Sequence, residues 1–91
     1  MEFIKEKDRI YKEESGKTIA EVLFPDNGEG VVTITRTFVD KSLQGQGVAD
    51  ELLQAVVSEL QAQGKQAVAV CSYAVKWFEK HPEHEDLLKR I

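Results

Sequence analysis

The sequence predicts an α/β fold: an antiparallel β-meander, then a strand–helix–strand unit and short C-terminal helices. Three observations predict it. The first part of the chain consists of short alternating segments separated by turn residues. One long stretch in the middle has apolar residues at helical spacing and stops at Gly64. A short apolar run, residues 67–70, comes directly after it, as in a buried parallel strand.

The meander is predicted from three strands. Residues 9–14 and 18–24 alternate in hydropathy, and the Ser-Gly-Lys segment 15–17 between them is typical of a tight hairpin turn. Residues 25–30 are rich in Pro, Asp, Asn and Gly and predict a turn. The third strand, residues 31–39, is rich in β-branched residues.

Arg36 conflicts with the pattern of the third strand. Val32, Ile34 and Phe38 share one parity, and Arg36 interrupts their row. A bulge at residues 35–37 would re-aim the side chains and relieve the conflict. Alternatively, Arg36 lies on a half-exposed face of a regular strand, and this simpler interpretation is preferred.

The strand–helix–strand unit spans residues 31–71. After a connector at residues 40–44, a helix is predicted from about residue 47 to residue 63, and a strand at residues 66–71. A crossover of this kind makes the two strands parallel. The apolar stripe of the helix consists of Val48, Leu52, Leu53, Val56, Val57 and Leu60.

Two short helices are expected at the C-terminal end. The first covers residues 72–80 and ends before Pro82, and the second covers residues 83–91 with Leu87, Leu88 and Ile91 directed inward.

Composition limits the class of protein. A chain of 91 residues is expected to form a single domain, residues 1–91. The net charge is −4 and no run of basic residues occurs, which argues against nucleic acid as the main partner. No apolar stretch approaches the roughly 20 residues of a membrane span. The single cysteine, Cys71, fits a reducing compartment, so a cytoplasmic location is expected.

The segment 44–49 (Gln-Gly-Gln-Gly-Val-Ala) is the strongest functional signal. It lies between a predicted strand and a predicted helix, where unpaired amides and the positive end of the helix dipole attract anions. Gly45 and Gly47 would let a phosphate approach the backbone. The P-loop pattern is absent, and Asp50 stands where the dinucleotide fingerprint needs its third glycine.

Gln44, Gly47 and Ala49 fill the pattern Gln/Arg-x-x-Gly-x-Gly/Ala. This pattern resembles the acyl-CoA-binding motif of the Gcn5-related N-acetyltransferase superfamily. The chain is most similar to a compact subgroup of about 90–100 residues, and the resemblance covers about residues 8–88. The matching segments are Thr37-Phe38-Val39, Gly45-Gln46-Gly47, Cys71-Ser72-Tyr73, Trp77-Phe78 and His81-Pro82.

The resemblance implies a minimal form of that superfamily's fold and transfer of an acetyl group from acetyl-CoA to an amine. The acceptor, a small molecule or a protein, is unidentified. Residues 37–39 would pair with the pantetheine arm; otherwise they are an ordinary strand end. The residues implied to bind coenzyme A are Thr37, Phe38, Val39, Gln44, Gly45, Gln46, Gly47, Val48 and Ala49.

The chain also departs from the family pattern. Ser72 stands where the subgroup often has proline, and the helices that shape the acceptor site in larger members are missing. An alternative is therefore an acyl-CoA-binding module with little or no transferase activity. A third hypothesis is an interaction domain that uses the exposed face of the meander, but it leaves the glycine loop unexplained.

Cys71 and Tyr73 are the candidate residues for the chemical step. Cys71 precedes a predicted helix, whose N-terminus favours a thiolate. By resemblance it lies near the thioester, where it would be an acyl acceptor, a partner in a mixed disulfide with coenzyme A, or a small packed residue. The resemblance also implies that the Tyr73 hydroxyl protonates the departing thiolate.

The remaining candidates have structural interpretations. His81 and His84 lack the usual zinc spacings, so no metal is expected. We expect His81 to lie at a helix end and His84 at the surface. Trp77 and Phe78 are expected to close the small core rather than line the cleft.

Overall fold

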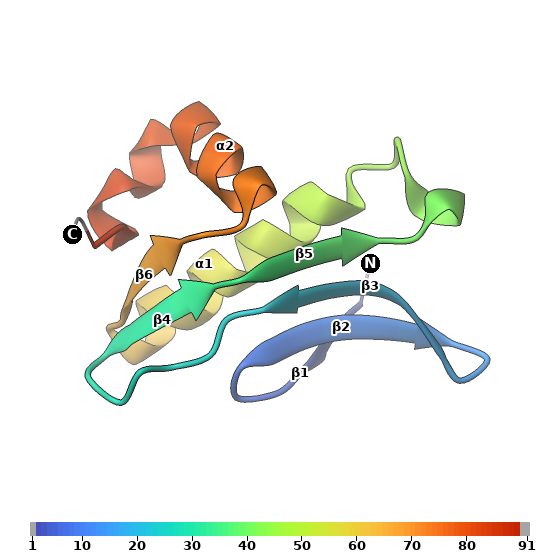
Figure 1. Cartoon of the computed structure of the whole chain (residues 1–91), viewed down its shortest axis with the longest axis horizontal. Coiled ribbons are helices and arrows are strands. Elements are labelled where there is room, and N and C mark those ends of the chain that lie inside the picture. The colour runs from blue at the N-terminus through green and yellow to red at the C-terminus, as the bar shows by residue number, and fades with distance from the viewer. Residues whose placement is uncertain (1, 90–91) are drawn as a thin grey trace.

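The computed structural model describes residues 2–89 and confirms the predicted fold class (Figure 1). The antiparallel meander comes first and the strand–helix–strand unit follows it. In chain order the elements are β1 (Ile4–Lys5), β2 (Arg9–Glu14), β3 (Lys17–Leu23), β4 (Val31–Ile34), β5 (Arg36–Val39), the 3₁₀ helix η1 (Lys41–Leu43), α1 (Val48–Gln63), β6 (Gln66–Ala69), α2 (Ser72–Lys80) and the 3₁₀ helix η2 (Pro82–Leu87).

The strands form two sheets. The antiparallel sheet has the order β1-β2-β3-β5, and β4 pairs with β6 in a parallel, two-stranded sheet. The predicted parallel pairing is therefore confirmed. The short strand β1 was not predicted, and it pairs with β2 at the edge of the antiparallel sheet.

The hairpin between β2 and β3 forms where the sequence predicts it. Ser15 and Gly16 both have positive φ angles, 53° and 78°. Two consecutive left-handed residues match the natural twist of a hairpin, and glycine adopts this conformation without steric cost.

The prediction of one continuous strand over residues 31–39 is wrong. The strand is interrupted at Thr35, where the amide donates to the carbonyl oxygen of Leu23 at 3.0 Å. The first half, β4, pairs with β6, whereas the second half, β5, pairs with β3. The preferred interpretation of Arg36, a half-exposed face of a regular strand, is therefore wrong in its regular strand: Arg36 directly follows an irregularity within residues 35–37, as the alternative proposed, and its side chain is 56% exposed.

Helix α1 packs its apolar stripe against the sheet. Gly47 is its N-cap, and Gly64 ends it in a left-handed conformation with its amide bonded to the carbonyls of Gln61 and Leu60. In Figure 1, α1 crosses behind β4 and β5. The core consists of Ile10, Ala20, Val22, Phe24, Val32, Ile34, Val48, Leu52, Leu53, Val56, Val57, Leu60, Ala67, Ala74, Trp77, Phe78 and Leu87.

The C-terminal part differs from the prediction in two places. The strand β6 ends at Ala69 rather than at residue 71, because its partner β4 ends at Ile34. The predicted helix at residues 83–91 is instead the 3₁₀ helix η2, after which Lys89 donates to the carbonyl of Ala67 at 2.8 Å. Residues 90 and 91 of that prediction lie outside the described part. Within residues 2–89, no helix is long and apolar enough to cross a membrane.

Candidate active site

Hydrogen bonds hold the loop between β5 and α1 in one arrangement. The carboxylate of Asp40 caps η1, accepting from the Ser42 amide at 3.1 Å and from the Ser42 hydroxyl at 2.7 Å. Gln46 is tied back to this turn: its side-chain Nε2 donates to the Ser42 carbonyl at 3.2 Å and its amide to the Leu43 carbonyl at 3.3 Å. The loop is therefore shaped before any ligand arrives.

Gly45 and Gly47 have φ angles of 83° and 75°, which only glycine adopts without strain. A Cβ atom built at either position would project into open space. The first helical hydrogen bond of α1 runs from the Glu51 amide to the Gly47 carbonyl at 3.1 Å. The amides of the preceding first turn have no partner within the helix, and they lie at the positive end of its dipole.

Two adjoining hollows meet at this loop. They have volumes of about 590 and 230 Å³. Together they bring to one place every predicted coenzyme A-binding residue except Gln46. The first is lined by Thr37, Phe38, Val39, Asp40, Lys41, Gln44, Ala49 and Tyr73. The second is lined by Val39, Leu43, Gln44, Gly45, Gly47, Val48, Ala49, Asp50 and Tyr73.

Strand β5 forms one wall of the larger hollow. The amide of Asp40 donates to the Ile19 carbonyl of β3 at 2.8 Å. Because amides alternate in direction along an antiparallel strand, the amide of Phe38 is also directed at β3, whereas the amide of Val39 faces the hollow and the amide of Thr37 donates to the sulfur of Cys71. The hydroxyl oxygen of Thr37 is buried and has no well-aligned hydrogen-bond partner among the described residues.

Cys71 lies at the N-cap of α2, across from Thr37. The pKa of its thiol is below the ordinary value. Partial burial raises this pKa, but hydrogen bonding from the Ala74 amide, from Thr37 and from the Tyr73 amide outweighs burial. The contact with the Thr37 hydroxyl is poorly aligned, so we assign most of the effect to the amides. The geometry thus favours a thiolate at this position.

Tyr73 extends from the first turn of α2 into both hollows. Its pKa is raised, first by burial and then by the negative charge of Asp50. The hydroxyl therefore keeps its proton at neutral pH. The carboxylate of Asp50 in turn accepts a hydrogen bond from the Trp77 indole nitrogen at 2.7 Å.

Asp50 belongs to this site, although the sequence motifs did not indicate it and marked the residue only as a mismatch to the dinucleotide fingerprint. An acidic residue in the first turn of a helix ordinarily stabilises the helix dipole. The contact with Trp77 joins residues 27 positions apart in the sequence. No local pattern indicates such a contact.

The two histidines lie behind Trp77. His81 caps the end of α2, as expected, and its Nε2 is 3.5 Å from Oδ1 of Asp50. The expectation that His84 is a surface residue is wrong: its side chain is 17% exposed and stacks on Trp77 with an interplanar angle of 3°. Trp77 and Phe78 are buried, as expected. Residues 2–89 contain no cluster of metal-ligating side chains.

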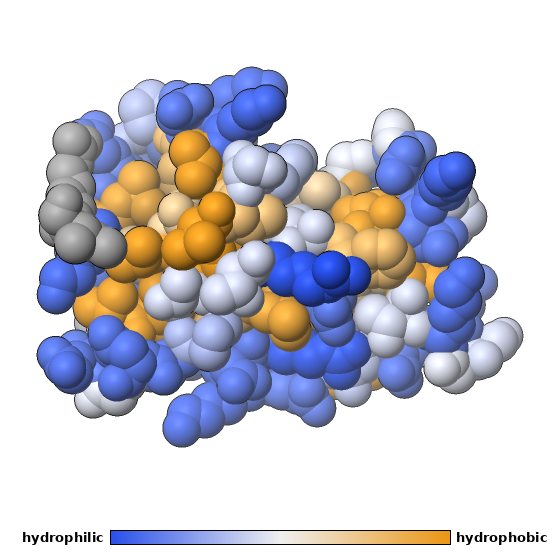
Figure 2. All heavy atoms as spheres, viewed as in Figure 1, coloured by the Kyte–Doolittle hydropathy of each residue, from blue (hydrophilic) through white to orange (hydrophobic). Residues whose placement is uncertain are grey.

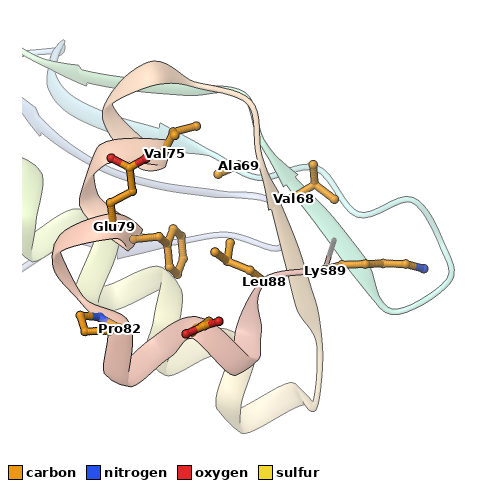
Figure 3. A pocket seen from close by; sticks show the side chains of 9 residues that line it. Val68, Ala69, Val75, Glu79, Pro82, Leu88 and Lys89 are labelled. Carbon is orange, nitrogen blue, oxygen red and sulfur yellow. The ribbon is translucent and has the colours of Figure 1, made fainter. Parts of the chain in front are cut away.

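Another hollow, of about 510 Å³, lies between α2 and β6 (Figure 3). Its walls include Val68, Ala69, Val75 and Leu88, which are labelled in the figure. None of the predicted site residues lines it. Most of the predicted site residues instead line the two hollows at residues 44–49, so we place the candidate active site there.

The match to a family model decides the classification. The model of the GCN5-related N-acetyl-transferase family matches residues 9–87. The chain belongs to this family. Acetyl transfer is accordingly its general activity, and the fold implied by the sequence resemblance is confirmed. No match was found among curated proteins.

Solved structures agree with this classification. A proposed GCN5-like N-acetyltransferase from Staphylococcus aureus superposes with a TM-score of 0.80 at 26% identity, over 99% of this chain and 89% of that one. The ribosomal-protein-S18-alanine N-acetyltransferase of Escherichia coli has a TM-score of 0.64 at 19% identity, over 86% of this chain and 50% of that one. A proposed streptothricin acetyltransferase from Bacillus anthracis, in complex with acetyl coenzyme A, has a TM-score of 0.59 at 18% identity, over 86% and 48%. The chain spans about half the length of the last two.

Proposed function

We propose that this protein transfers an acetyl group from acetyl-CoA to an amine, and that the hollows at residues 44–49 bind the donor. The observation that carries the proposal is the loop itself. Two glycines in left-handed conformation leave open space beside the unpaired amides of a helix N-terminus. A diphosphate fits this arrangement because amides hold it without a basic side chain. The related fold of the Bacillus anthracis protein was solved with acetyl coenzyme A, which supports this choice of donor.

The wall formed by β5 fits the pantetheine arm. The amide of Val39 faces the hollow, and the buried hydroxyl of Thr37 is available to a polar partner there. An extended ligand with amide groups would pair with this edge as an added strand does. We therefore assign Gln44–Ala49 to the diphosphate and Thr37–Val39 to the arm, with the amide of Phe38 engaged by β3 and only its side chain and carbonyl available.

In the proposed reaction, bound acetyl-CoA supplies a thioester whose carbonyl carbon accepts the amine. The Val39 amide is placed to donate to the carbonyl oxygen as negative charge develops on it. Tyr73 keeps its proton at neutral pH and would pass it to the leaving sulfur as the carbon–sulfur bond breaks. The proton released by the amine goes to solvent.

A two-step route through Cys71 is the variant of this mechanism. Its thiol pKa is lowered, so a thiolate is available to take the acetyl group before the amine does. Cys71→Ala separates the two routes. Full activity of this variant would exclude the two-step route, whereas lost activity together with ping-pong kinetics in the wild type would support it.

The first test of the function is calorimetric titration with acetyl-CoA, with NAD and ATP as controls. Binding of acetyl-CoA alone is expected, and its absence would overturn the proposal. Release of free coenzyme A in the presence of a panel of amines then tests transfer. One alternative has a distinct outcome: tight binding without turnover on any amine would identify an acyl-CoA-binding module.

A further inference from the structure

The two parallel strands β4 and β6 stay paired only as far as Ile34, and the chain segments that follow them separate. We call the space between these segments, β5 on one side and the start of α2 on the other, the notch. The carbonyl of Ile34 accepts hydrogen bonds from the amides of both Val70 and Cys71, at 3.1 and 3.0 Å. Beyond this bond, β5 turns to pair with β3 and the other chain segment enters α2. Cys71 and Thr37 are thus the first residues on either side of the notch that contact each other.

The notch has an inner and an outer face. Side chains alternate along a strand, so Thr37 and Val39 of β5 lie on the inner face, where Val39 packs against the core, and Arg36 and Phe38 lie on the outer face; Phe38 also borders the larger hollow. The inner face is closed by α1, which crosses behind β4 and β5 in Figure 1. A second substrate would therefore reach an acetyl group beside Cys71 from the outer face.

Arg36 is a charged residue at the outer rim of the notch, next to Thr37 in β5. Its Nε lies 3.4 Å from Oε1 of Glu21, and its guanidinium lies over the Phe38 ring, 5.3 Å from the centroid. These are its only partners among residues 2–89, so both terminal amino groups remain available. The other oxygen of Glu21 is held by Arg9 at 2.8 Å, which fixes the carboxylate that orients Arg36.

The surroundings of Arg36 combine charge with apolar surface. Figure 2 shows this face, with hydrophobic areas on either side of a hydrophilic centre. Val70, which follows β6 at the notch, is 62% exposed, and Val75 of α2 is also exposed. An exposed ion pair such as Arg36–Glu21 contributes little to stability, so stability alone gives a weak reason for an arginine at this position.

We propose that the acceptor of this enzyme is an amino acid-like amine, and that the terminal amino groups of Arg36 bind its carboxylate at the outer rim of the notch. The inference rests on the proposed function. Guanidinium pairs with carboxylate through two parallel hydrogen bonds, which fixes orientation as well as adding affinity. The exposed valines would contact the apolar part of the same molecule.

The test measures acetylation of a panel of α- and ω-amino acids, each beside its own carboxamide, which lacks the negative charge. In Arg36→Gln, kcat/KM for carboxylated acceptors should fall about tenfold or more, since a charge-assisted pair is lost. For the carboxamides it should change by less than about twofold. The ratio of kcat/KM for each amino acid to that for its carboxamide is compared between the wild type and Arg36→Gln. This comparison cancels the difference in intrinsic reactivity between the two amines.

Lys5→Gln is the matched control, because Lys5 is a similarly exposed cation whose Nζ lies 3.4 Å from Oε1 of Glu59, and it lies on β1, at the opposite edge of the antiparallel sheet from β5. It should leave the acceptor preference unchanged. Calorimetry of the amino acids with the coenzyme A-saturated protein adds a binding readout that needs no turnover.

The two hypotheses fail in different ways. No binding of acetyl-CoA to the wild type would overturn the proposed function. Normal binding of acetyl-CoA, combined with equal use of acids and carboxamides in wild type and Arg36→Gln, would overturn the role of Arg36 alone. That role would likewise be overturned if no carboxylated amine binds the saturated protein or is acetylated.

Discussion

Replacing Gly47 with alanine tests whether the left-handed conformation at this position is needed for ligand binding as well as for stability. Gly47 has a φ angle of 75°, and the added Cβ would meet no other atom within 4 Å. The cost to the free protein is therefore the left-handed conformation alone, about 1 kcal/mol. For a domain of this size, that lowers Tm by about 4–8 °C.

Gly64 provides the matched control at the other end of α1. Its φ angle is 66°, and its Cβ position is equally open. Gly64→Ala should therefore lose about the same stability, about 1 kcal/mol. Unlike Gly47, Gly64 lines neither hollow of the candidate site.

Binding of acetyl-CoA should distinguish the two variants. In Gly47→Ala the methyl group occupies the open space where the phosphate would approach. If the backbone also leaves the left-handed conformation to relieve its strain, the loop amides no longer point at the phosphate. Loss of one charge-assisted hydrogen bond corresponds to a dissociation constant about tenfold to hundredfold larger. Calorimetry should show this loss in Gly47→Ala and wild-type affinity in Gly64→Ala. Equal affinities in the two variants would refute the assignment of the loop.

Three further predictions concern single contacts. The pKa of Asp26 is lowered, chiefly by its hydrogen bond to Lys65, so the wild type loses stability as the pH falls and Asp26 takes up a proton. Lys65→Met should remove this pH-dependent part of the stability. An acid denaturation curve equal to that of the wild type would contradict the prediction. Trp77→Phe deletes a hydrogen bond to Asp50 and buried volume, and should lower the free energy of unfolding by about 2 kcal/mol in denaturant titration. Alkylation of Cys71 by iodoacetamide should proceed at lower pH than for an unstructured thiol and slow when coenzyme A is bound; an ordinary pH dependence would refute the lowered thiol pKa.

Local patterns predicted most elements well because each depends on neighbours in the chain. The stripe from Val48 to Leu60 and the stop at Gly64 indicated α1 almost to the residue. Ser15 and Gly16 indicated the hairpin, since the turn needs two residues with positive φ. The loop at residues 44–49 was found for the same reason: glycines at the start of a helix indicate a close approach to the backbone.

The same local patterns failed where the partner strand decided the outcome. Residues 31–39 read as one strand, because the sequence does not show that β4 and β5 pair with different neighbours. The end of β6 at Ala69 depends on the end of β4 at Ile34, and the segment after η2 is extended because it pairs with Ala67 through the Lys89 amide. Packing between distant segments outweighed local preference in each case.

The sequence by itself determined the family, the fold class and the position of the glycine loop before a helix, because these depend on residue types at fixed short spacings. Only the tertiary structure decided which side chains surround the loop. It brought Tyr73 and Asp50 together, set Thr37 beside Cys71, and paired Arg36 with Glu21 of β3. Those relations join separate elements, and they arise from the interruption at Thr35 and the packing of α2 on α1, which a short-range pattern does not encode.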